Sequence, residues 1–108
     1  MIKDKHRYIL VESSVKFEEH GRLDFESELY KELLVAVGEI NYHKVNPKMI
    51  RFLDDNRFII RCNLGGYKDL VVAFSLVKRL GERNIAFYTL KASGTIRALT
   101  RSFPVSSL

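Results

Sequence analysis

The segment from Arg57 to Phe74 constrains the fold most, because its hydrophobic period changes across a pair of glycines. Between Arg57 and Leu64 apolar and polar side chains alternate, as in a strand that buries one face. From residue 68 to residue 80 apolar side chains recur at the spacing of an amphipathic helix, and Gly81 ends the pattern. The segment therefore predicts a strand, a tight turn at Gly65-Gly66 and a helix that packs on the sheet. The side chains expected on the core side are Phe58, Ile60, Cys62 and Leu64 on the strand, and Leu70, Ala73, Phe74, Val77 and Leu80 on the helix.

The first half of the chain predicts a strand followed by a helix. Arg7 to Val15 is rich in β-branched and other apolar residues, so we expect a central strand there. Asp24 opens the helix, and glutamates in its first turn favour the positive end of the helix dipole. Gly38 lies near the expected end of this helix and is a candidate left-handed cap. The predicted apolar stripe consists of Phe25, Leu29, Leu33, Ala36, Val37 and Ile40.

A hairpin and a fourth strand complete the predicted sheet. Asn46-Pro47 breaks the chain. The strand-like runs at 49–53 and 57–64 are joined by Asp54-Asp55-Asn56, which has the composition of a tight turn. Residues 85–92 are expected to form the fourth strand. After Ser93-Gly94-Thr95 we expect a short terminal helix or packed tail with Ile96, Leu99 and Phe103.

The order of these elements is β-α-β-β-α-β, which indicates an α+β fold of the ferredoxin-like, or RNA-recognition-like, class. In this class a four-stranded antiparallel sheet carries two helices on one face. We expect residues 1–108 to form a single domain of this kind, with the C-terminal helix or tail as an addition. The other face of the sheet is then expected to be uncovered and available to RNA, a second subunit or a small ligand.

The charge of the chain is unevenly distributed along the sequence. Residues 1–60 contain ten Lys and Arg against eleven Asp and Glu, a net charge of −1, whereas residues 61–108 contain eight against two, a net charge of +6. The whole excess of +5 therefore comes from the second half. Such asymmetry favours a polyanionic partner such as nucleic acid, although a solvated basic surface without a partner gives the same pattern.

The sequence gives little support for catalysis or for a metal site. His6, His20 and His43 are scattered, and none stands at a metal-ligand spacing to another or to Cys62. A lone cysteine on the inner side of a strand is most often a core residue. A single cysteine also excludes an internal disulfide and is typical of a reducing, cytoplasmic setting. We find no apolar stretch of the length that a signal peptide or a membrane span needs, so no membrane association is expected.

Small phosphatases with this element order are an alternative, because they use a glycine-rich loop and an arginine after the first strand. The corresponding segment here, Lys16-Phe-Glu-Glu-His-Gly21, is acidic and lacks that loop. Asp54 and Asp55 are a possible carboxylate pair, but their position in a hairpin turn explains them better. The phosphatase interpretation is therefore weak.

The glycine pair at 65–66 has two interpretations. It lacks both the GxxxxGK[ST] and the GxGxxG patterns, so a nucleotide site is not indicated. In the structural interpretation, glycine permits a positive φ where the chain turns sharply. In the functional one, Tyr67 stacks on a base or sugar, Lys68 adds charge and the amides of the following helix bind a backbone phosphate.

The basic residues of the second half are the remaining candidates for binding. RNA-recognition motifs place aromatic side chains on their exposed central strands. Here the strand that starts at Arg57 presents Arg57, Ile59, Arg61 and Asn63 outward instead. We therefore expect contacts with the backbone of a folded RNA rather than base stacking. The predicted RNA-binding residues are Arg61, Gly65, Gly66, Tyr67, Lys68, Lys78, Arg79, Lys91, Arg97 and Arg101.

The second half of the chain resembles a known family, archaeal ribonuclease P protein component 2, which belongs to the small ribonuclease P protein subunits of archaea and eukaryotes. The resemblance rests on the segment from Ile59 to Phe74, with its strand–glycine–helix turn, and on the strand that leads into Ser93-Gly-Thr-Ile-Arg97. The first half matches in pattern, through Arg7-Tyr-Ile-Leu-Val and an acidic helix with Gly38. Gly65, Gly66 and Gly94 match the family, as do the nearby charges Arg61, Lys68 and Arg97.

The resemblance implies a ferredoxin-like fold and a non-catalytic role. In this family the protein helps an RNA enzyme to remove the 5′ leader from precursor tRNA, and the RNA holds the active site and its magnesium ions. The implied partners are the ribonuclease P RNA, precursor tRNA and a barrel-fold subunit called component 3, with a possible homodimer inside a heterotetramer. No cofactor is expected on the protein. A ferredoxin-like regulatory domain that binds a small ligand remains the alternative.

Overall fold

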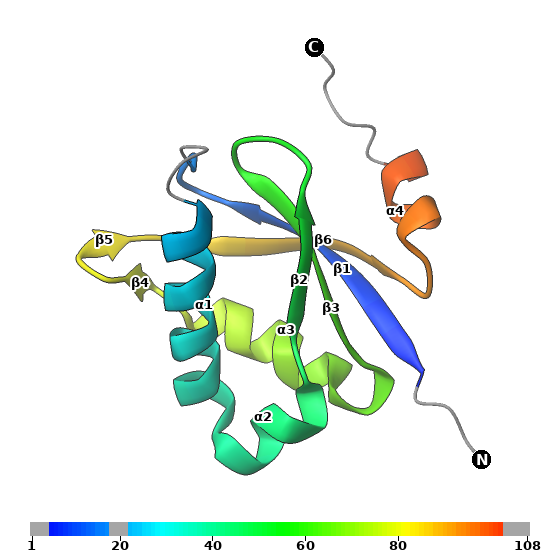
Figure 1. Cartoon of the computed structure of the whole chain (residues 1–108), viewed down its shortest axis with the longest axis horizontal. Coiled ribbons are helices and arrows are strands. Elements are labelled where there is room, and N and C mark those ends of the chain that lie inside the picture. The colour runs from blue at the N-terminus through cyan, green and yellow to red at the C-terminus, as the bar shows by residue number, and fades with distance from the viewer. Residues whose placement is uncertain (1–4, 18–21, 103–108) are drawn as a thin grey trace.

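The computed structural model describes residues 5–17 and 22–102 (Figure 1). Phe103 and residues 18–21, about which the sequence made predictions, lie outside the described residues. The described elements are β1 (His6–Ser13), α1 (Arg22–Val37), α2 (Glu39–Val45), β2 (Lys48–Phe52), β3 (Arg57–Asn63), the 3-10 turn η2 (Leu64–Gly66), α3 (Tyr67–Leu76), β4 (Arg79–Leu80), β5 (Arg83–Asn84), β6 (Phe87–Ser93) and α4 (Ile96–Ser102).

The long strands form one antiparallel sheet in the order β2-β3-β1-β6, and β4 and β5 form a separate small hairpin. The prediction of an α+β fold with a four-stranded antiparallel sheet is confirmed. The strand order is compatible with a ferredoxin-like sandwich, because the first strand lies between the third long strand and the last. In the described part of the chain, no helix has the length and hydropathy that a membrane span requires.

The main core lies between one face of the sheet and helices α1 and α3 (Figure 1). Phe58, Ile60 and Cys62 alternate along β3 and are fully buried, as their spacing predicts. The Phe58 ring lies at the centre of an aromatic cluster, 5.7 Å from the Phe25 ring of α1 and 6.2 Å from the Phe74 ring of α3, between ring centroids. Leu64 instead begins the 3-10 turn and is 38% exposed, so its predicted inward position is wrong.

A second apolar cluster occupies the opposite face of the sheet, which the sequence predicted to be uncovered. Leu10 of β1 and Ile59 of β3 are paired across the sheet and fully buried. Leu99 of α4 packs on them and is itself fully buried. The Thr95 Oγ1 atom accepts a hydrogen bond from the Ala98 N–H at 3.3 Å and caps the start of α4. The terminal helix is therefore confirmed, and it covers the centre of a face that we expected to be open.

The first predicted helix is divided into two. Gly38 has φ 84° and ψ 156°, a positive-φ conformation that favours glycine but differs from the predicted left-handed cap. The chain therefore changes direction, and α2 begins at Glu39. Ile40 is 86% exposed, so its assignment to the buried stripe is wrong. The stripe of α1 itself, centred on Leu29 and Leu33, is confirmed.

The second long helix is shorter than predicted. It ends at Leu76, because Val77 is extended, and residues 79–84 form the β4–β5 hairpin around Gly81, whose φ is +61°. Val77 and Leu80 are nevertheless buried. Two buried residues three positions apart fit a helix equally well as an extended chain that enters a turn, which explains the incorrect prediction.

Candidate functional site

The sheet face beneath α4 carries a row of basic side chains. Arg61 of β3 pairs with Tyr8 of β1 and with Lys48 of β2, and directly paired residues point to the same face of a sheet. Arg51 pairs with Ile59 and Lys91 pairs with Leu10, which both belong to the cluster under α4. Lys48, Arg51 and Lys91 are exposed, whereas Arg61 is half-buried.

Helix α4 adds two more cations to this face. Arg97 and Arg101 are exposed and stand one helical turn apart, so they share a side of α4. Ile96 and Leu99 pack against the sheet instead. We call the combined surface the basic face and define it by Lys48, Arg51, Arg61, Lys91, Arg97 and Arg101. The four long strands and α4 contain one acidic residue, Glu12, so few negative charges offset this surface.

The sequence prediction contained four of these six residues and missed Lys48 and Arg51. Both lie in the first half of the chain, whose net charge is slightly negative, whereas the charge count favoured the basic residues of the second half. The signal that identifies them is the hairpin turn at 54–56, which brings β2 alongside β3. A register shift between Met49 and Arg51 places both side chains on the face of Arg61 and Ile59.

The glycine turn forms a second group, which is packed against α2. A Cβ at Gly66 would lie 2.5 Å from the Val45 Cα atom, whereas one at Gly65 would meet nothing nearer than the Lys44 Cε atom at 4.0 Å. Neither glycine has a positive φ, so the predicted reason for glycine here is wrong. Position 66 requires glycine because the end of α2, an element that the sequence did not predict, packs directly on it.

The side chains around this turn are partly engaged in the fold. Tyr67 is half-buried and packs against the main core, while Lys68 is exposed. The Lys44 Nζ atom lies 3.9 Å from Asp69 Oδ2, and the Asn63 amide donates to the Lys44 carbonyl at 3.2 Å. RNA contact by residues 65–68 stays a prediction, and Lys44 is the cation of α2 that lies beside it.

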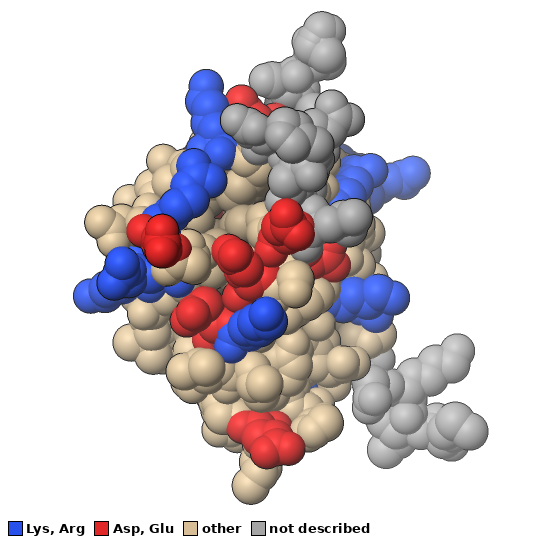
Figure 2. Space-filling view, turned by 60° about the vertical axis from the view of Figure 1, so that its left-hand side comes forward, with Lys and Arg blue, Asp and Glu red and all other residues tan. Residues whose placement is uncertain are grey.

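The third predicted group, Lys78 and Arg79, lies apart from the other two. Both residues are exposed at the β4–β5 hairpin, which stands at the opposite end of the molecule from α4 (Figure 1). Helix α1, which packs beside β4, carries Asp24, Glu26, Glu28 and Glu32. The left-hand side of the view in Figure 1, turned forward in Figure 2, shows acidic side chains gathered in the middle and basic ones around them. The ten predicted residues therefore do not form one continuous surface.

Cys62 and Asp54, the residues with possible catalytic chemistry, both have roles in the fold. Burial raises the pKa of the Cys62 thiol to about 11, although the nearby Arg7 charge acts to lower it, so the thiol is protonated at neutral pH. Partial burial acts to raise the pKa of Asp54, but hydrogen bonds from Arg57 and from the Asn56 amide outweigh burial and lower it. In the described part of the chain, no three His, Cys, Asp or Glu side chains are grouped as metal ligands.

Fold and surface together define a small α+β protein whose sheet carries an apolar cluster capped by a C-terminal helix and a surrounding basic face. The chain belongs to the Rpp14/Pop5 family, whose model matches residues 7–103. This result confirms the resemblance that the sequence showed.

Individual relatives are ribonuclease P protein components 2 from archaea. The protein of Pyrococcus furiosus is 26% identical over 103 residues, which cover 94% of this chain and 85% of the relative. The protein of Pyrococcus horikoshii is 29% identical with the same coverage. The protein of Methanoculleus marisnigri is 30% identical over 93% of this chain and 62% of the relative.

Proposed function

We propose that this chain is a protein subunit of ribonuclease P that binds the RNA component through the basic face and supports removal of the 5′ leader from precursor tRNA. Membership of the Rpp14/Pop5 family and the names of the archaeal relatives support this role. The observation that carries the RNA-binding part is the basic face, whose six cations lie on elements that together contain one acidic residue. We also propose that the fold is ferredoxin-like, which the strand order supports.

The position of α4 determines how this surface contacts RNA. Leu99 covers Leu10 and Ile59, which occupy the middle of the face where RNA-recognition motifs stack bases. The cations lie around this covered centre, so they contact phosphates of a folded RNA rather than splayed bases. Such contacts position a protein and depend strongly on salt.

The protein partners use the helical layer in this proposal. Val35 of α1, Ile40 of α2 and Leu76 of α3 are 79%, 86% and 58% exposed. Apolar surface of this kind is typical of a protein interface. We place component 3 and a possible second copy of this chain, within a heterotetramer, on the helical layer, so that the basic face stays available to RNA.

Catalysis belongs to the RNA in this account. The protein supplies positive charge and shape, while magnesium ions bound by the RNA supply the chemistry. The protein itself binds no cofactor, and the assembly acts on precursor tRNA in the cytoplasm.

A salt titration of RNA binding tests the proposed surface. The native chain should bind ribonuclease P RNA with a slope of log affinity against log salt of about −4 to −5, which corresponds to about five phosphate contacts. The double variant Lys48→Gln/Arg61→Gln should reduce the size of the slope by about 1 to 2. The matched variant Lys78→Gln/Arg79→Gln removes the same charge at the hairpin and should leave the slope nearly unchanged. Equal slopes for the native chain and the basic-face variant would exclude this surface.

A further inference from the structure

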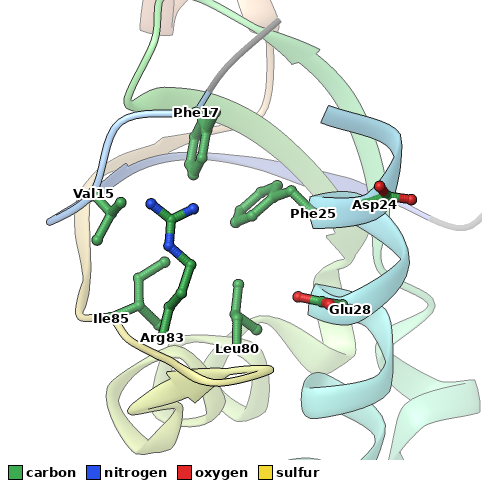
Figure 3. Close-up of a pocket in the computed structure, with 8 residues that line it drawn as sticks. All are labelled: Val15, Phe17, Asp24, Phe25, Glu28, Leu80, Arg83 and Ile85. Atoms are coloured by element: carbon green, nitrogen blue, oxygen red, sulfur yellow. The ribbon is translucent and has the colours of Figure 1, made fainter. Parts of the chain in front are cut away.

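A cavity of about 370 Å³ lies between the start of α1, the end of the β1 segment and the β4–β5 hairpin (Figure 3). Its volume is within the range of pockets that hold small molecules, toward the lower end. It is distant from the basic face, because the hairpin and α4 stand at opposite ends of the molecule (Figure 1). Its lining residues are Val15, Phe17, Asp24, Phe25, Glu28, Leu80, Arg83 and Ile85.

The floor of the cavity is apolar and belongs to the main core. Phe17, Phe25, Leu80 and Ile85 are each no more than 9% exposed. The Phe17 and Phe25 rings pack with centroids 4.1 Å apart, and the Phe25 ring is also 5.7 Å from Phe58. Because core packing holds these side chains, the floor is formed before any ligand binds.

Opposite charges enter the cavity from opposite walls. Glu28 points inward from α1 and Arg83 points inward from the hairpin, while the Asp24 carboxylate, one turn before Glu28, is turned outward (Figure 3). Among the described residues, neither Glu28 nor Arg83 has an ion-pair partner within 4.0 Å. A Cβ at Gly81 would be 3.4 Å from Glu28 Oε1, so this carboxylate rests against the hairpin turn.

This arrangement matches a zwitterion with an apolar body. An ammonium group is attracted to Glu28, with Asp24 adding negative potential, and a carboxylate accepts paired hydrogen bonds from the Arg83 guanidinium. An apolar side chain on the carbon that carries both groups covers the floor. A phosphate ligand meets the repulsion of two carboxylates, and a polyamine meets the repulsion of Arg83 and leaves the floor uncovered.

We infer that this cavity binds a free α-amino acid with an apolar side chain, with the ammonium group at Glu28 and the carboxylate at Arg83. The inference does not rest on the proposed role in ribonuclease P, because it uses a different end of the molecule. It gives the chain a small-molecule site in addition to its proposed role in an RNA enzyme.

Calorimetric titration of the full chain with L-phenylalanine and L-leucine tests the inference. Both should bind at least about tenfold more tightly than N-acetyl-L-phenylalanine, which lacks the ammonium, than phenethylamine, which lacks the carboxylate, and than glycine, which lacks the apolar body. Glu28→Gln and Arg83→Gln should each weaken binding of L-phenylalanine by about tenfold or more. The matched variants Glu32→Gln, one turn further along α1, and Arg79→Gln, on the neighbouring strand, should bind like the native chain.

Three results would overturn the inference. The first is the absence of binding heat and of amide shift changes around the cavity at about 10 mM amino acid, where even a millimolar ligand is mostly bound. The second is equal affinity for the amino acids and their blocked analogues, and the third is an equal loss of affinity in all four variants. Glu28, Arg79 and Arg83 are exposed and Glu32 is half-buried, so circular dichroism and thermal melting should show native folding in each variant.

Discussion

Gly66 and Val45 are in such close contact that a Cβ at position 66 would lie 2.5 Å from the Val45 Cα atom and 2.8 Å from its Cγ2 atom. The neighbour is backbone as well as side chain, so it cannot move aside without shifting the end of α2. At Gly65, one residue earlier, a Cβ would make only an ordinary contact with the Lys44 Cε atom at 4.0 Å. The two glycines of one turn therefore differ in what they contribute.

We predict that Gly66→Ala destabilises the protein by about 1 to 3 kcal/mol or more, the range for forcing an extra carbon into a packed site. Gly65→Ala is the control and should change the free energy of unfolding by less than about 0.5 kcal/mol. Urea unfolding of both variants measures the difference. Equal stabilities would mean that α2 does not pack on the turn.

Leu99→Ala should destabilise the protein by about 2 kcal/mol or more, because the fully buried side chain fills the apolar cluster on the sheet. Arg101→Ala removes an exposed side chain from the same helix and should have little effect on unfolding. Hydrogen exchange on β1 and β3 should also increase in the Leu99 variant alone. A loss below about 0.5 kcal/mol would show that α4 leaves the sheet in solution.

The pKa of Asp54 is lowered in the folded protein, so its ionised form favours folding. Asp54 Oδ1 accepts the Arg57 N–H at 2.9 Å, and the Arg57 Nη2 atom lies 2.6 Å from Asp54 Oδ2. This contribution is complete above the unfolded pKa, about 3.9, and is lost as pH falls through the lower folded value. The native chain should therefore be more stable than Asp54→Asn at pH 6, and the difference should shrink below about pH 4. Chemical unfolding at several pH values measures it, and a difference that grows in acid would contradict this sign.

The sequence predicted those parts of the fold that depend on local periods and turn chemistry. The alternation at Phe58, Ile60 and Cys62 and the turn at Asp54 were enough to define the hairpin, and with the helix between the first two strands they indicated the order of elements. Ile40 was misassigned because its helical spacing continues past Gly38, whereas the positive φ of that glycine redirects the chain. The packing of Leu99 against Leu10 and Ile59 joins residues far apart in sequence, so no local pattern could predict it.

The candidate site was predicted in part for the same reason. Arg61 was found because strand alternation points it away from the core. Lys48 was missed because its place beside Arg61 is set by strand pairing across a register shift. Lys78 and Arg79 were grouped with Arg61 by charge and sequence proximity, but the β4–β5 hairpin carries them away from it.

Cleavage of precursor tRNA by a reconstituted ribonuclease P tests the central claim most directly. The RNA and its partner proteins should be assayed over a range of magnesium concentrations, first without this chain, then with the native chain, with Lys48→Gln/Arg61→Gln and with Lys78→Gln/Arg79→Gln. We predict that the native chain and the hairpin variant raise the cleavage rate and lower the magnesium requirement, and that the basic-face variant does so much less. If leaving the chain out changes neither the rate nor the magnesium requirement, the proposed function is wrong.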